Sequence, residues 1–313
     1  MKSLRSLGSW LGVFVLWAVH FLPLAGIGAI GAGLGSLLYR FGRGHVTRVN
    51  LALCFPEMSA PARDDLGRRH FRMLGRNALE LSVMVWGSEK QLLELIRLDG
   101  LEHLTAAARG GRPVIVFAPH FIGLNMGGIR VAYEYPGTAS VYSKQKNPVL
   151  DRIFLRARTR FGNPHLVSRQ EGLRSIVRAI KSGKPFYFLP DMDFGIRDAI
   201  FSPFFGVPTA TITALPRLAK LTGASVIPVI TRQEGDHYVA RIYPAWDNYP
   251  TGDLEADVRR MNAFIEERVR EMPEQYFWAH KRFKTRPPGE PNPYRKIGPP
   301  TEPAPERSSR GQG

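Results

Sequence analysis

The N-terminal stretch of this sequence constrains its fold most, because residues 6–39 contain no Lys, Arg, Asp or Glu. A single bilayer crossing needs roughly 20 apolar residues. The stretch is longer than the apolar core of about 7 to 15 residues in a cleaved signal peptide, and no sharp cleavage site follows it. Pro23 and five glycines between residues 26 and 35 weaken a continuous helix. We therefore expect residues 1–40 to form a membrane anchor, either one spanning helix or a shallow hairpin.

The anchor carries two further signals. Gly31 and Gly35 form a small-xxx-small pair, which can bring helices close together in lipid, although such pairs are frequent in glycine-rich segments. Basic residues flank both ends, namely Lys2, Arg5, Arg40, Arg43 and Arg48. Their distribution favours a cytoplasmic position for the main domain.

The overall charge predicts a negatively charged partner. Lys and Arg number 43 against 27 Asp and Glu, which gives a net charge of +16. Nucleic acid, anionic lipid and an acidic carrier protein all carry suitable charge, but a membrane segment without a recognition motif argues against nucleic acid. Cys54 is the single cysteine, which excludes an internal disulfide and argues against a cysteine zinc site.

From residue 56 onward the sequence first has a charged helical pattern, and then β-rich runs alternate with helical stretches. Arginines and apolar residues recur at helical spacing over 63–79, which predicts an amphipathic helix, either near the membrane or on the surface of the main domain. Short β-rich runs then alternate with helical stretches: we expect strands at 113–118, 140–142, 185–189, 225–231 and 238–243, and helices at 150–160, 171–182, 212–222 and 253–271.

This alternation predicts an α/β domain over residues 41–286, with a central mixed, largely parallel sheet flanked by helices. Residues 287–313 contain eight prolines and few apolar side chains. Such a segment buries too little surface to order itself, so we expect a disordered tail there.

His120 is the leading candidate for a reactive side chain. It follows the apolar run 114–118, so it should lie at the carboxyl end of a buried strand, where open α/β sheets bind their ligands. A lone histidine is more often structural than catalytic. Asn125, five residues further on, can enter the next helix and turn its side chain back towards the imidazole. Such a partner would fix the tautomer and leave the other ring nitrogen free as a general base.

Several blocks occur in one chain in a specific order. They are HFIGLN at 120–125, Val141-Tyr142 followed by Asn147-Pro148 and Asp151, LPDMDFG at 189–195, FSPFFGVP at 201–208 and PEQYFWAHKRFKTRP at 273–287. With the anchor, they make nearly the whole chain resemble the late acyltransferases of lipid A biosynthesis, the lauroyl and myristoyl transferases within the lysophospholipid acyltransferase superfamily.

The resemblance implies direct acyl transfer. His120 would take the proton from the hydroxyl of a 3-hydroxyacyl chain, and the alkoxide would attack the thioester of an acyl carrier protein, with no metal, other cofactor or acyl-enzyme. In the family an Asp or Glu stands where this chain has Asn125. A neutral amide cannot stabilise the imidazolium by charge. The expected outcomes are weak or absent activity, or a site in which Asp191 or Asp193 takes over, and we expect Asn125→Asp to raise the transfer rate.

The resemblance also gives Arg158 and Asp191 roles in catalysis. Arg158 can bind a lipid phosphate or the developing oxyanion. It points away from the stripe of arginines at 152, 156 and 160, although a solvated helix face remains an alternative. Asp191 follows the strand expected at 185–189, and can orient that arginine, polarise the acceptor or cap a turn.

Two further residues are candidates for substrate binding. The family often has an arginine directly after Val-Tyr, where this chain has Ser143 and then Lys144. Lys144, or Lys146, can substitute as a point charge without the bidentate geometry of arginine. Asp193, the second acid of the LPDMDFG block, is the other candidate.

The resemblance therefore implies transfer of a fatty acyl chain from acyl carrier protein to a Kdo-bearing lipid A precursor, at the cytoplasmic face of the bacterial inner membrane, in lipopolysaccharide biosynthesis. The phosphorylated precursor, anionic inner-membrane lipids and the acidic carrier would all favour a basic protein. Two alternatives stay open: a weak or silent family member that binds acyl-lipid or carrier, and an acyltransferase acting on another membrane lipid.

Overall fold

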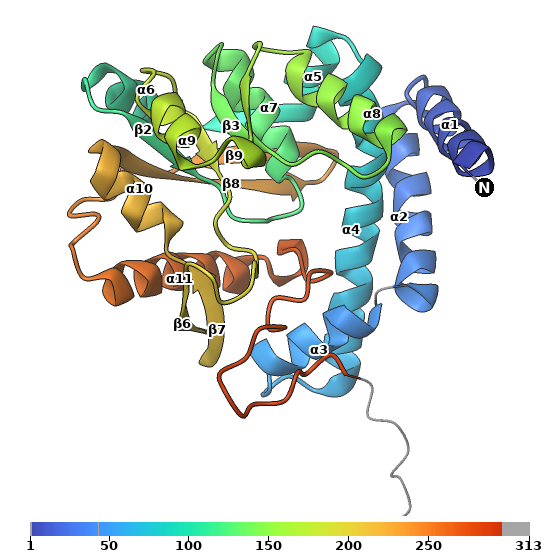
Figure 1. The fold of residues 1–313 in the computed structure, drawn as a ribbon. Helices are drawn as coiled ribbons and strands as arrows, with labels where there is room; N and C mark the ends of the chain where they lie inside the picture. The colour runs from blue at the N-terminus through green and yellow to red at the C-terminus, as the bar shows by residue number, and fades with distance from the viewer. Residues whose placement is uncertain (1, 43, 296–313) are drawn as a thin grey trace, which may run out of the picture.

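The computed structural model describes residues 2–42 and 44–295, so Arg43 and residues 296–313 of the expected tail lie outside it. The N-terminal part is helical, as Figure 1 shows, and comprises α1 (Lys2–Val19), α2 (Leu24–Phe41), α3 (Gly44–Cys54), α4 (Ala60–Trp86) and α5 (Glu89–Leu95). Ser59 caps the start of α4, and Pro61 occupies its first turn, where a missing N–H has no cost.

A seven-stranded sheet forms the centre of the main domain, in the order β1-β9-β8-β2-β5-β3-β4. Its pairings are parallel except for the antiparallel pair β8–β9. The strands are β1 (Ile96–Asp99), β2 (Val114–Phe117), β3 (Ala139–Tyr142), β4 (His165–Ser168), β5 (Phe186–Phe188), β8 (Ser225–Glu234) and β9 (His237–Ile242). The mixed, largely parallel sheet is thus confirmed, although the sequence did not predict β1, β4 or a separate hairpin of β6 (Ala199–Phe204) and β7 (Val207–Ile212).

Helices cover both faces of this sheet, and successive residues of β2 point into opposite cores. Val114 and Val116 pack with α6 (Leu101–Arg109) and α7 (Leu124–Glu134). Ile115 and Phe117 pack with the helices of the opposite face, which are α9 (Leu173–Ile180), α10 (Ala214–Thr222) and α11 (Leu254–Glu271). The remaining helices are α8 (Pro148–Thr159) and the 3₁₀ turns η1 (Arg169–Glu171) and η2 (Pro273–Gln275).

The expected anchor consists of two helices, α1 and α2, joined by a turn that ends at Pro23. One face of α2 packs tightly on α4. A Cβ at Gly35 would lie 1.9 Å from the carbonyl oxygen of Phe71, and a Cβ at Gly31 would lie 2.7 Å from that of Gly75. The small-xxx-small pair therefore joins two helices of the same chain.

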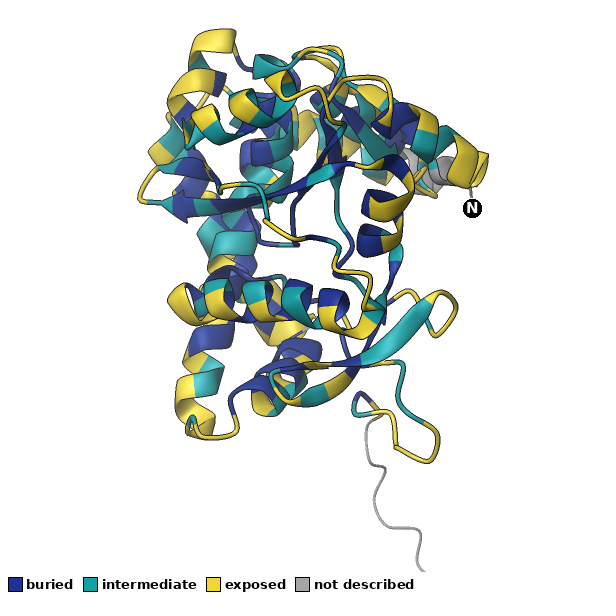
Figure 2. Ribbon diagram, turned by 90° about the vertical axis from the view of Figure 1, so that its left-hand side faces the viewer, coloured by how far each residue is buried: buried dark blue, intermediate teal, exposed yellow. Residues whose placement is uncertain are grey.

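The other faces of α1 and α2 expose large apolar side chains, as the yellow of the N-terminal helix in Figure 2 illustrates. Among the described residues, α2 is the helix that is long and apolar enough to cross a membrane, on length and composition alone. Exposed members of this surface include Trp10, Phe14, Leu34, Leu37 and Phe41, together with Phe21 of the connecting turn.

The chain remains packed beyond Pro287, where the disordered tail was expected to begin. Tyr294 is buried, its hydroxyl donates to Asn50 Oδ1 at 2.5 Å, and the same hydroxyl accepts from the backbone N–H of Phe283 at 3.0 Å. This single aromatic ring attaches the first residues of the proline-rich segment to the domain.

Candidate active site

His120 lies in the loop between β2 and α7, at the carboxyl edge of the sheet, as its position after an apolar run predicts. Residues 273–287, the C-terminal block, hold this loop in place. The backbone N–H of Phe277 donates to the carbonyl of His120 at 2.9 Å, and the N–H of Ile122 donates to the carbonyl of Gln275 at 2.8 Å. His120 is partly exposed, whereas the residues on either side of it are buried.

Asp191, from the loop after β5, is the partner of His120. Nδ1 of His120 and Oδ1 of Asp191 lie 2.6 Å apart, and the backbone N–H of His120 donates to Oδ2 of Asp191 at 2.8 Å. Asp191 is fully buried and also accepts from the hydroxyl of Tyr276 at 3.3 Å. A carboxylate at Nδ1 selects the tautomer with the proton on Nδ1, which leaves Nε2 as the basic nitrogen.

The environment of Asp191 keeps it ionised. Burial alone raises its pKa, but the charge of a protonated His120 and the hydrogen bonds from His120 outweigh burial, and Arg282 adds to their effect. The pKa of the Asp191 carboxyl therefore lies below its usual range. An ionised Asp191 can stabilise an imidazolium on His120.

Asn125 does not occupy the position that the sequence predicted for it. Its Oδ1 accepts a hydrogen bond from an Arg158 Nη2 at 3.1 Å, while Asp191 takes the Nδ1 side of His120. The reason is geometric: the loop after β5 reaches the same sheet edge as His120, and Asn125 has already entered the first turn of α7. The acid that pairs with His120 is 71 residues away in sequence.

Arg158, near the end of α8, faces Asn125 across the site. Burial lowers the pKa of its guanidinium, which nevertheless stays protonated at neutral pH. The guanidinium also lies 5.8 Å from the ring centroid of Tyr142. Within the described residues, Arg158 forms no ion pair with a carboxylate.

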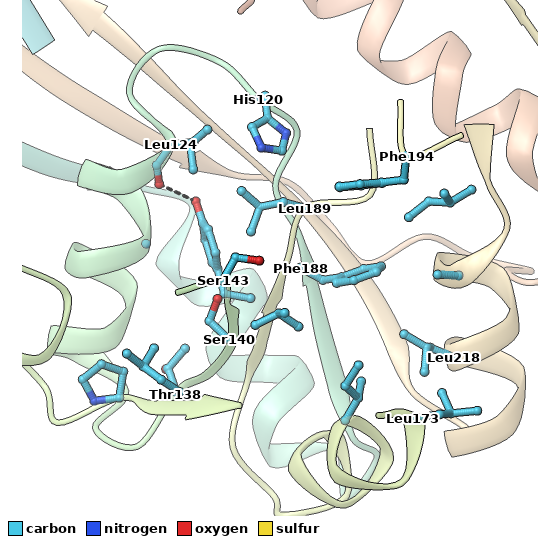
Figure 3. Close-up of a pocket in the computed structure, with 18 of the residues that line it drawn as sticks. His120, Leu124, Thr138, Ser140, Ser143, Leu173, Phe188, Leu189, Phe194 and Leu218 are labelled. Atoms are coloured by element: carbon cyan, nitrogen blue, oxygen red, sulfur yellow. Dashed lines mark hydrogen bonds between the residues drawn. The ribbon is translucent and has the colours of Figure 1, made fainter. Parts of the chain in front are cut away.

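Tyr187 fixes the start of α7, and with it Asn125. Its hydroxyl donates to the carbonyl of Leu124 at 2.9 Å, the dashed line in Figure 3. Its ring lies against Gly128, where a Cβ would come within 3.1 Å of the ring. Glycine at this position therefore allows the buried tyrosine to approach the helix closely.

Asp193 and Lys144 are not part of this cluster. Both oxygens of Asp193 are engaged by Thr285, whose backbone N–H and hydroxyl donate at 2.8 and 2.9 Å. Asp193 is buried and attaches the C-terminal block to the loop after β5. Lys144 is exposed; hydrogen bonds from Tyr142 and Gln145 lower the pKa of Asp151, and the charge of Lys144 adds to their effect.

A cavity of about 920 Å³ opens beside His120, Asn125 and Arg158. In Figure 3, His120 lies at one end, with Ser140 of β3 and Thr138 just before that strand on one side and Leu218 and Leu173 on the other. The lining residues come from helices α7 and α8 as well as from helices α9 and α10. The part between α9 and α10 is mainly apolar, with Leu173, Ile176, Phe188, Ile212, Leu218 and Leu221, and Thr213 and Arg217 also line it.

The C-terminal block contributes residues that sequence reasoning did not single out. Tyr276 contacts Asp191, and the buried guanidinium of Arg282 donates to the carbonyl of Ala210 at 2.9 Å. Burial lowers the pKa of His280 to about 4, so it is neutral at pH 7. Its Nε2 accepts from the backbone N–H of Asp193 at 3.1 Å. The signal that the sequence offers is the block 273–287 itself, which supports the resemblance without assigning roles to its members.

Metal ligands do not gather in the part of the chain that is described: no three His, Cys, Asp or Glu side chains there are grouped to hold an ion. The fold and the site define an α/β protein with a hydrogen-bonded His–Asp pair beside a largely apolar cavity.

A family model, bacterial lipid A biosynthesis acyltransferase, matches residues 1–285, and this chain belongs to that family. The lipid A biosynthesis lauroyltransferase of Escherichia coli (strain K12) is 33% identical over 291 residues, which span 91% of this chain and 94% of that protein. The palmitoleoyltransferase of the same organism is 33% identical over 287 residues, spanning 90% and 92%, and the myristoyltransferase is 30% identical over 296 residues, spanning 93% and 91%. The resemblance found in the sequence is confirmed.

Proposed function

We propose that this protein transfers a fatty acyl chain from acyl carrier protein to a hydroxyl of a Kdo-bearing lipid A precursor, with His120 as the general base. The observation that carries the proposal is the His120–Asp191 pair, with Nδ1 and Oδ1 2.6 Å apart, at the wall of the cavity. Family membership supports the reaction class and the lipid A pathway.

In the proposed reaction, Nε2 of His120 accepts the proton of the acceptor hydroxyl. The alkoxide oxygen attacks the thioester carbonyl carbon, and a tetrahedral oxyanion forms. When this intermediate collapses, the C–S bond breaks, and the carrier's thiolate takes the proton from Nε2. Asp191 stabilises the imidazolium between these two proton transfers. The scheme needs no metal, no other cofactor and no acyl-enzyme.

The cavity supports an acyl substrate by its size and lining. Its volume of about 920 Å³ lies within the range of roughly 300–1,000 Å³ typical of ligand pockets. We assign the donor's hydrocarbon chain to the apolar part between α9 and α10, since each buried CH₂ contributes about 0.8 kcal/mol of transfer free energy.

We further propose that the exposed apolar surface of α1 and α2 lies in the inner membrane, with the main domain on the cytoplasmic face. The net charge of +16 favours anionic lipid, the phosphorylated acceptor and an acidic carrier protein. Cys54 is buried, so one cysteine introduced at exposed Arg109 gives a clean label site. A membrane-impermeant maleimide should label it in inverted inner-membrane vesicles and not in intact spheroplasts. The reverse pattern would contradict the orientation.

A competition assay tests the function. The purified protein is given C10 to C16 acyl carrier proteins together with equimolar Kdo-bearing lipid A precursor and lysophosphatidic acid, and the products are identified by mass spectrometry. We expect one acyl chain to be added to the lipid A precursor. Acylation of lysophosphatidic acid alone would assign the protein to another membrane lipid, and binding of the acyl carrier protein without transfer to either acceptor would support a silent binding protein.

A further inference from the structure

We infer that Asn125 and Arg158 together form an anion-binding donor pair, which binds the tetrahedral oxyanion of the transfer reaction. This assignment rests on the proposed function for the identity of the anion, but not for the existence of the anion site. Asn125 thereby acts as a hydrogen-bond donor to the reacting group rather than as a substitute for the acid of a His–acid dyad.

The first step is the orientation of the Asn125 amide. An arginine side chain has five N–H donors and no acceptor. The atom of Asn125 that faces the Arg158 Nη2 at 3.1 Å must therefore be its oxygen. The NH₂ group of Asn125 is consequently directed away from the guanidinium, and within the described residues it has no hydrogen-bond acceptor. Since Asn125 lines the cavity, these donors are available to a ligand there.

The second step is the charge of Arg158. A buried cation is costly unless an anion or several acceptors compensate it. Arg158 is partly buried; among the described residues its hydrogen-bond acceptor is the neutral Asn125 oxygen, and its guanidinium lies 5.8 Å from the ring centroid of Tyr142 and forms no ion pair with a carboxylate. The cavity wall beside His120 thus carries an uncompensated positive charge.

The third step is rigidity. Tyr187 holds the first turn of α7 through the Leu124 carbonyl and packs against Gly128, so Asn125 lies on a fixed backbone. Donors that are fixed before the reaction stabilise a developing oxyanion without reorganisation. An Asp at position 125 would keep the shape of the side chain, but it would pair with Arg158 and replace the free donor by an acceptor.

Binding of a tetrahedral anion tests this site independently of turnover. Octylphosphonate and its neutral counterpart octanol are titrated calorimetrically into the full-length protein in a non-ionic detergent. We expect the wild type to bind octylphosphonate at least ten times more tightly than octanol, and Asn125→Asp to remove this preference. Asn125→Leu, which cannot donate, should lose it too, and keeps the test informative if the first variant does not fold.

Asn147→Asp serves as the matched control. It makes the same amide-to-acid change at the N-cap of α8, outside the cavity lining, where aspartate also caps a helix. Its preference for the phosphonate should equal that of the wild type. An unchanged preference in Asn125→Asp and Asn125→Leu would overturn the inference, whether or not the wild type shows transfer. A wild type that prefers octylphosphonate but transfers no acyl chain would sink the proposed function and leave the anion site standing.

Kinetics then identify the anion. For an oxyanion, Asn125→Asp should lower kcat by about 10²-fold or more and leave the KM of the acceptor nearly unchanged. A rise in acceptor KM with an unchanged kcat would instead assign the pair to a phosphate of the acceptor, and would overturn the oxyanion assignment. A higher kcat in Asn125→Asp would overturn it as well.

Discussion

At the scale of single residues, the pairing of His120 with Asp191 changes the meaning of position 125. The amide at that position weakens the expected dyad only if its side chain faces the imidazole. It faces Arg158 instead, and Asp191 contacts both the ring and the backbone of His120. His120 therefore keeps a charged partner, and for the proposed reaction we now expect Asn125→Asp to lower activity rather than raise it.

Asp191 and Asp193 lie on the same loop after β5, so their Asn variants can be compared directly. We expect Asp191→Asn to lower kcat for acyl transfer by about 10²–10⁴-fold, because the amide removes the charge that stabilises the imidazolium and permits the wrong tautomer. Asp191→Asn also disturbs buried hydrogen bonds from His120 and Tyr276, so kcat is measured at a temperature at which the variant is folded. The measurement is steady-state transfer together with thermal unfolding of the same samples.

Asp193→Asn should differ from Asp191→Asn in its effect on kcat. This variant disturbs the hydrogen bonds to Thr285 and Gly195, and so we expect it to destabilise the fold by about 1–3 kcal/mol, with a much smaller effect on kcat. Equal losses of kcat in the two variants at a temperature where both are folded would contradict the division of roles between the two acids.

The position of His120 could be predicted from sequence, whereas its partner could not. The apolar run 114–118 requires a buried strand, and whatever follows such a strand lies at the sheet edge. Choosing between Asn125, Asp191 and Asp193 requires the relative positions of two loops, which depend on the β2–β5 register and on the C-terminal block behind them. No local periodicity encodes that arrangement.

At the scale of elements, the packing of α2 on α4 joins the apolar N-terminus to the main domain. Gly31 and Gly35 face Gly75 and Phe71 at backbone contact distance, while Arg76 and Glu80 on α4 form a buried ion pair at 2.6 Å. Glu80 also accepts from the hydroxyl of Tyr238 at 2.5 Å, which ties α4 to β9. Thus α4 contacts the exposed apolar helix on one side and the sheet on the other.

Alanine substitutions at Gly35 and Gly33 of α2 distinguish the effect of helix–helix packing on stability from the effect of helix propensity. We expect Gly35→Ala to destabilise the protein by about 1–3 kcal/mol, because the added methyl would lie 1.9 Å from the Phe71 oxygen and would force the helices apart. Gly33→Ala meets nothing within 4 Å, and should be neutral or stabilising by up to about 1 kcal/mol. Thermal unfolding in detergent compares them, and equal melting temperatures would argue against tight α2–α4 packing.

At the scale of the whole molecule, the sequence predicted the inner strands of the sheet but neither its edge strands nor the position of the block 273–287. Alternating β-rich and helical runs predicted the inner strands because these are buried and apolar. The edge strands β1 and β4 are partly polar, with Arg97, Asp99 and His165, and carry no clear period. The block 273–287 wraps behind the site through hydrogen bonds to His120, Ile122 and Asp191, which only the folded chain reveals.

The most direct test of the account is a single-turnover assay of His120→Gln against the wild type, with acylated carrier protein and the Kdo-bearing lipid A precursor at saturating concentrations. Glutamine approximates the imidazole in size but cannot act as a base at neutral pH. We predict that the wild type adds one acyl chain to the acceptor and that His120→Gln transfers at least about 10²-fold more slowly, while still binding the carrier. Transfer by His120→Gln at the wild-type rate would contradict the role of His120 as the general base.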